Sequence, residues 1–204
     1  MNAARRPRRA AVAAALASAA LFLSACAGQQ AGSAATIGTA RITEQALASN
    51  VEEVFAAQGL PTDSADELIT QETLSRMIII DLVDTLAERT GVVVSQGRVD
   101  QELQAYIAQS GDRDAMVASF TQQGIAPSMI EDIIRLNLLA TDLGVALAPD
   151  GAPEEQGQAV FDAASALSIE LGVETSPRFG TWDPSALQVG PGSSDLAILP
   201  STAS

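Results

Sequence analysis

The stretch from residue 65 to residue 89 constrains the fold of this chain more than any other. Its large apolar residues recur too often to fit on a single helical stripe; they are Leu68, Ile69, Leu74, Met77, Ile78, Ile79, Ile80, Leu82, Val83 and Leu86. A helix that is apolar most of the way round is buried among other elements. The sequence therefore predicts a helical bundle with this segment at its centre.

Shorter segments with helical spacing surround the central one. Thr43 is a candidate N-cap for a helix that carries Leu47, Val51, Val54 and Phe55 and ends near Gly59. Turn residues separate four more expected helices, at about 96–109, 113–123, 128–148 and 154–167. Extended runs at 36–41 and 168–173 are expected to pair as a small two-stranded β ribbon. The predicted fold class is thus mainly α, a multi-helix bundle with one ribbon.

The N-terminus has the charge order of an export signal. Arg5, Arg6, Arg8 and Arg9 precede an uncharged apolar run over 10–22, which is too short for a membrane span. Leu23-Ser24-Ala25-Cys26 then matches a lipobox, so residues 1–25 are expected to be removed and Cys26 to carry the lipid. The alternative is an uncleaved Ala-rich anchor with an incidental cysteine. The pattern predicts a lipid-anchored protein on the extracytoplasmic face of the cell membrane, and it leaves Sec or twin-arginine export open.

The charge balance after Cys26 is strongly acidic. All 25 acidic residues follow it, against seven arginines, which leaves a net charge of −18. Such a surface repels nucleic acid and anionic lipid headgroups, so attachment to the membrane is expected through the lipid alone. The acidic surface either attracts basic segments of binding partners or simply keeps the protein soluble. Residues 26–35 are small and polar and are expected to form a flexible tether.

The absence of two residue types limits catalysis. The chain has no histidine and no lysine, which excludes Ser–His and Cys–His nucleophilic systems, Lys Schiff bases and His-rich zinc sites. Acid–base chemistry would rest on carboxylates or Tyr106, as in a two-carboxylate glycosidase, but aromatic residues make up only 3% of the chain. We expect no enzyme activity, no catalytic residues, no cofactor and no metal.

The order of these segments resembles the N-terminal domain of SurA/PrsA-type periplasmic chaperones, the fold shared with the peptide-binding part of trigger factor. Three stretches carry the resemblance: residues 37–43 before the first helix, residues 82–99 where the long helix ends at Gly91 and restarts after Ser95, and Gly124-Ile125-Ala126-Pro127 with the Ile- and Leu-rich helix after it. Residues 176–183 also resemble the closing segment of SurA-like lipoproteins from high-GC Gram-positive bacteria. The resemblance spans about 35–183, and the Pro/Gly/Ser-rich segment 184–204 is expected to be a disordered tail.

The resemblance implies a peptide-binding module without catalytic activity. Relatives often carry a parvulin prolyl-isomerase domain before the last helix, but here that junction is only the turn at 149–153. The implied function is that of a membrane-tethered, ATP-independent holdase for exported unfolded polypeptides, without prolyl-isomerase activity. The alternative is a structural lipoprotein that binds one specific envelope partner.

The resemblance also implies an apolar groove for extended segments. The residues expected to line it are Met77, Met116, Phe120, Met129, Ile133, Phe179 and Trp182. Methionine adapts to varied partners, which favours such a role, but the same methionines, with Phe120 and Ile133, also fit an ordinary core. The segment with Arg178, Phe179 and Trp182 either crosses the groove in place of a bound polypeptide or packs on the bundle as a capping strand.

Overall fold

The computed structural model describes residues 32–61 and 66–192. The chain divides into two units, Met1–Ser33 and Ala34–Ser204, and the helices of the described chain all belong to the second. The expected signal peptide at 1–25, the lipidated Cys26 and the start of the tether lie outside the described residues.

Six α-helices and one short 3-10 helix make up most of the described chain. They are α2 (Glu44–Ala57), α3 (Glu67–Thr90), α4 (Gln96–Ser110), α5 (Arg113–Gln122), η1 (Pro127–Met129), α6 (Ile130–Leu147) and α7 (Pro153–Leu171). Four of them begin at a side chain that accepts a hydrogen bond from a backbone N–H of the first turn: Thr43, Asp66, Ser95 and Asp112.

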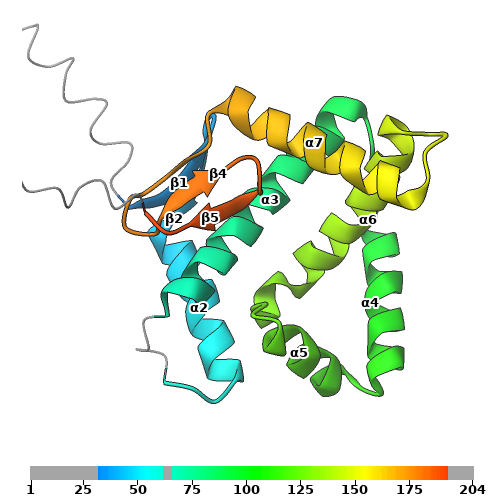
Figure 1. The fold of residues 1–204 in the computed structure, drawn as a ribbon. Coiled ribbons are helices and arrows are strands. Elements are labelled where there is room, and N and C mark those ends of the chain that lie inside the picture. The colour runs from blue at the N-terminus through cyan, green and yellow to red at the C-terminus, as the bar shows by residue number, and fades with distance from the viewer. Residues whose placement is uncertain (1–31, 62–65, 193–204) are drawn as a thin grey trace, which may run out of the picture. The chain divides into compact units, whose positions relative to one another are not determined.

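Helix α3 lies at the centre of the bundle, as its sequence predicts. It packs against α2, α6, α7 and a C-terminal strand, and Figure 1 shows these elements around it. Leu74, Ile78 and Leu82 on α3 are completely buried. The described core draws on residues from Ala34 to Val189, so a fragment that starts at residue 27 contains all of it.

Two small sheets complete the fold. Strands β1 (Ser33–Ile37), β2 (Ala40–Thr43) and β3 (Glu174–Thr175) form one sheet in the order β2-β1-β3. Strands β4 (Thr181–Asp183) and β5 (Gln188–Gly190) form the other, an antiparallel hairpin. The expected fold class, mainly α with a small β component, is confirmed, although the strands differ from those predicted.

The predicted ribbon between 36–41 and 168–173 is wrong in detail. The first segment is two strands joined by a turn at Gly38, which has a φ of 58°, and the second is helical as far as Leu171. Gly172 ends α7 in the left-handed conformation, and the N–H of Val173 bonds to the carbonyl of Ser168 at 3.0 Å. This Schellman arrangement ends the helix at the glycine, so residues 168–171 stay helical. Strand β3 therefore pairs later, with Thr175 opposite Ala35.

The boundaries of the expected tether and tail are also wrong. Ala34 and Ala35 are buried in β1, so the tether cannot reach residue 35. The predicted disordered tail from 184 is folded as far as β5, because Val189 pairs opposite Trp182 and both side chains are buried. Residues 193–204 lie outside the described part of the chain.

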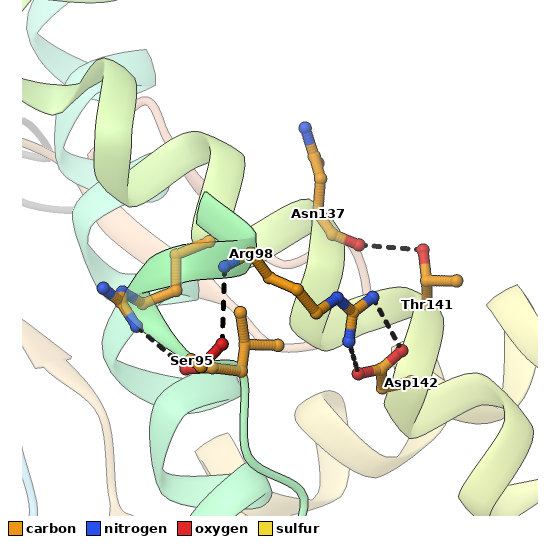
Figure 2. Close-up of polar contacts among 7 residues, drawn as sticks. Ser95, Arg98, Asn137, Thr141 and Asp142 are labelled. Atoms are coloured by element: carbon orange, nitrogen blue, oxygen red, sulfur yellow. Dashed lines mark hydrogen bonds and ion pairs between the residues drawn. The ribbon is translucent and has the colours of Figure 1, made fainter. Parts of the chain in front are cut away.

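The contact between α4 and α6 is closed by polar side chains at its edge. Figure 2 shows Arg98 on α4 reaching the Asp142 carboxylate of α6 through both terminal nitrogens. Arg135 on α6 donates to the carbonyl of Val94 at 3.3 Å and also to the Gln96 side chain. Val99 and Leu103 on α4 are buried.

Candidate functional site

A cleft of about 330 Å³ lies where the first half of α3 meets β5. Apolar and polar side chains share its walls: Leu68, Gln71, Glu72, Ser75, Arg76 and Ile79 come from α3, and Gln188 and Val189 from β5. The spacing of the α3 residues places them along one side of the helix. Leu68 is 63% exposed, so a large apolar side chain stands open to solvent at the cleft.

Strand β5 is held to α3 by the Ser75 hydroxyl. Ser75 Oγ donates to the carbonyl of Gln71 at 2.6 Å and accepts from the backbone N–H of Val189 at 2.8 Å. Both residues are buried, so the hydroxyl satisfies a strand N–H that would otherwise lie away from water without a partner. This contact fixes the β5 wall of the cleft.

The hairpin behind that wall depends on a glycine. Gly180 has a φ of 116°, and a Cβ built there would lie 2.1 Å from the carbonyl oxygen of Gly190. The same Cβ would lie 3.2 Å from Nε2 of Gln71. No other residue type fits this position without moving the backbone, so Gly180 sets how closely β4 and β5 approach α3.

Arg76 ties the other side of the cleft to the turn after α5. Its guanidinium donates to the carbonyls of Gly124 at 2.9 Å and Gln123 at 3.3 Å. Burial lowers the pKa of the guanidinium, and the attraction of the nearby Glu72 carboxylate acts in the opposite direction. The Arg76 guanidinium therefore binds backbone carbonyl oxygens of the protein itself.

The carboxylates at the cleft are arranged differently from Arg76. Glu72 is exposed and, among the residues that the structure describes, makes no hydrogen bond or salt bridge; its interaction is the longer-range attraction to Arg76. Glu67, one turn earlier, accepts a hydrogen bond from Nε2 of Gln71 at 3.0 Å. The cleft thus presents an uncommitted negative group to solvent beside an apolar surface.

None of the seven residues predicted to bind peptide lines this cleft. Five are buried in the core: Met116, Phe120, Met129, Ile133 and Trp182. Met77 is half-buried, and its sulfur accepts from the Asn50 amide of α2 at 3.6 Å. These positions agree with the alternative of an ordinary core, and a role for the seven residues in peptide binding stays a prediction.

The aromatic segment near the C-terminus packs as part of the hairpin. Half-buried Phe179 lies under the Arg178 guanidinium, 5.3 Å from ring centre to Cζ, and Arg178 forms a salt bridge with Glu44 at 2.8 Å. The indole Nε1 of Trp182 is buried and has no hydrogen-bond partner among the described residues. Trp182 is opposite Val189 in the hairpin, so the single tryptophan of the chain is one strand away from the cleft wall.

Sequence reasoning missed the residues that form the cleft. A signal was present on α3, where the polar residues Gln71, Glu72, Ser75 and Arg76 interrupt an otherwise apolar helix at i, i+4 spacing. Such a row of polar residues on a central helix indicates that a segment with polar groups packs against that side of the helix. Nothing in the sequence marks Gln188 and Val189 as its partners, because the contact joins residues 114 positions apart.

Within residues 32–61 and 66–192, no group of three or more His, Cys, Asp or Glu side chains is placed to hold a metal ion. No helix in the same part of the chain is long and apolar enough to cross a membrane.

Comparison with known proteins gives a family match. A family model described as the SurA-like N-terminal domain matches residues 5–144. This range includes the α3 side of the cleft but ends before α7 and the β4–β5 hairpin. No curated protein and no solved structure matches the chain.

Proposed function

Because the chain belongs to the SurA-like N-terminal domain family, a chaperone-type domain, we propose that it is a lipid-anchored, extracytoplasmic holdase for unfolded exported polypeptides. The observation that carries the proposal is the open cleft on α3, where exposed Leu68 lies beside hydrogen-bonding side chains. Extended polypeptides are recognised by surfaces of this mixed kind, with apolar contact for affinity and polar groups for orientation.

The holdase part of the proposal needs no energy source and no chemistry. An unfolded chain exposes apolar segments that aggregate at micromolar concentration, and a reversible binder that covers them slows that process. We also propose that the protein has no prolyl-isomerase activity. The direct connection of α6 to α7 supports this, because α6 ends at Leu147 and α7 begins at Pro153 with only a turn between them.

The anchor part rests on the sequence around Cys26. The lipid would hold the domain at the outer membrane face, where exported chains emerge unfolded, and the acidic surface would add no attraction to lipid headgroups. A Cys26→Ser chain should leave the membrane fraction while its unfolding midpoint stays that of the wild type. A Cys26→Ser chain that still fractionates with membranes after signal cleavage would contradict the anchor.

Suppression of aggregation tests the holdase directly. Residues 27–204, which contain the whole described core, are mixed at several-fold molar excess with a chemically denatured client that is then diluted, and light scattering is followed. The proposal predicts slower and smaller scattering for several unrelated clients. No suppression of any client would refute it, and stoichiometric capture of one envelope protein alone would favour the structural role instead.

A further inference from the structure

The size of the α3–β5 cleft limits which polypeptide segments it accepts. The inference about those segments rests on the proposed function. The cleft volume of about 330 Å³ is at the lower end of the range for ligand pockets. It suits one or two side chains of an extended segment better than a folded surface. Leu68, Ile79 and Val189 supply its apolar contacts, so a large apolar side chain is the natural occupant.

The charges at the cleft favour a basic neighbour for that side chain. The Arg76 donors are committed to the carbonyls of Gln123 and Gly124, whereas the Glu72 carboxylate is exposed without a bonded partner among the described residues. An incoming segment therefore meets an exposed carboxylate to which no donor among the described residues is hydrogen-bonded. Arg or Lys beside the apolar residue would satisfy it, and Asp or Glu would be repelled.

The charge of the whole protein acts in the same direction. After Cys26 the chain has 25 acidic residues and seven arginines, and three of those arginines are engaged in ion pairs with Glu170, Asp142 and Glu44. The surrounding field attracts cationic segments and speeds their encounter at low ionic strength.

We propose that the α3–β5 cleft binds extended segments of other polypeptides in which a large apolar side chain stands next to Arg or Lys. Leu68 contacts the apolar side chain, and Glu72, one turn further along α3, pairs with the basic one; Ile79 lies about three turns beyond Leu68 and extends the apolar wall. The cleft then selects among unfolded chains, because an equally apolar segment with acidic neighbours binds more weakly.

Three fluorescein-labelled peptides in a Gly/Ser host test this selectivity. One carries a single Leu between two Arg residues, the second has Leu replaced by Ser, and the third has both Arg residues replaced by Glu. Fluorescence anisotropy with residues 27–204 should show the Leu/Arg peptide binding tightest. Loss of the Leu should weaken binding about tenfold or more, given the burial of one apolar side chain.

Two matched pairs of protein variants locate the contact. Leu68→Ser should weaken the Leu/Arg peptide about as much as loss of the peptide's Leu, whereas Val93→Ser, at a residue that is 81% exposed outside the cleft, should not. Glu72→Gln should weaken the Leu/Arg peptide about threefold at low salt and reduce the difference between the Arg and Glu peptides. Glu88→Gln removes the same charge from an exposed position on α3 outside the cleft and should leave that difference intact.

Each other outcome overturns the inference. Equal affinity for the Arg and Glu peptides, or Leu68→Ser and Val93→Ser with the same effect, would show that the cleft is not the selective site. A chain ending at residue 192 that binds all three peptides several-fold more tightly than residues 27–204 would assign the cleft to the protein's own C-terminal segment. Self-association abolished by Leu68→Ser, with no peptide bound, would assign the cleft to a second copy of the chain.

If aggregation is suppressed but the peptides are not discriminated, the inference fails alone. If aggregation is not suppressed, the proposed function fails with it.

Discussion

The contacts α3–β5 and α4–α6 both join distant parts of the chain through polar side chains, and the first of them borders a cleft. Between α4 and α6, Arg98 meets Asp142 through both terminal nitrogens (Figure 2), and Val99 and Leu103 on α4 are buried. Between α3 and β5, one hydroxyl of Ser75 holds a three-residue strand, and Leu68 beside it stays exposed. A three-residue strand covers only part of a helix face, which leaves Leu68 open to solvent.

The comparison predicts that the hairpin is the more vulnerable of the two regions. Gly180→Ala should have the largest effect, about 3 kcal/mol of lost stability, because its Cβ would overlap the Gly190 carbonyl at a φ that alanine avoids. Urea unfolding followed by Trp182 fluorescence measures it. Gly157→Ala, on an exposed stretch of α7 with nothing within 4 Å of the new Cβ, should instead stabilise by up to about 1 kcal/mol.

Removal of the hydroxyl that holds β5 should have the next largest effect. Ser75→Ala leaves the buried N–H of Val189 without its acceptor and should cost about 1–3 kcal/mol of unfolding free energy. Thr85→Ala removes a hydroxyl whose one hydrogen bond among the described residues goes to the Asp81 carbonyl, one turn back in the same helix. If Ser75→Ala costs no more than Thr85→Ala in urea unfolding, the hydroxyl does not hold the strand.

Removal of the ion pair at the closed contact should matter less than either change at the hairpin. Arg98→Gln breaks the salt bridge to Asp142 at the surface, but Val99 and Leu103 on α4 remain buried. A small fall in the unfolding midpoint is expected at low salt, and it should vanish at high salt because exposed pairs are screened. A double-mutant cycle with Asp142→Asn isolates the pair, and a large coupling that persists in salt would contradict this account.

The smallest effect concerns the α3 carboxylates near α6. The pKa of Asp84 is raised, chiefly by burial and further by Asp132 and Glu88, against the attraction of Arg135. A raised folded-state pKa favours folding fully below the unfolded pKa of about 3.9, and this contribution is lost as pH rises through the folded value. Asp84→Asn should therefore stabilise at neutral pH by a few tenths of a kcal/mol, since it removes a partly buried charge and the repulsion of that charge by Asp132 and Glu88.

The pH dependence separates this explanation from a general effect of asparagine. The advantage of Asp84→Asn should shrink in urea unfolding at pH 3.5, where the wild-type carboxyl is increasingly protonated. Asp150→Asn, in the exposed turn after α6, serves as the matched control. An advantage of Asp84→Asn that is equal at both pH values would show that charge is not its cause.

The sequence predicts the helices well because their signals are local. The apolar residues around α3 place it at the centre, and Gly91 with Ser95, or Gly111 with Asp112, ends one helix and begins the next within a few residues. The β4–β5 hairpin is different. Leu187 and Val189 lie in a Pro/Gly/Ser-rich stretch whose composition is typical of disorder. Val189 pairs with Trp182 and bonds to Ser75 of α3, more than 100 positions away.

The candidate site could be predicted only in part for the same reason, because one of its walls is formed by a distant segment of the chain. The polar residues on α3, from Gln71 to Arg76, can be recognised in the sequence, but their contact with β5 cannot. The prediction of peptide-binding residues rests on side-chain type, and the structure places most of these residues in the core, because methionine and phenylalanine fill buried space as readily as they line a groove. Exposed Leu68 is conspicuous only once the fold shows that nothing covers it.

Hydrogen exchange with and without an unfolded client tests the central claim most directly. Amide exchange along residues 27–204 is measured by mass spectrometry with an excess of a reduced, unfolded polypeptide that stays soluble. We predict slower exchange in the first half of α3, over 67–79, and in β5, over 188–190, with no change in α4. Protection confined to α4 and α6, or to no segment while the client is bound, would contradict a binding site between α3 and β5.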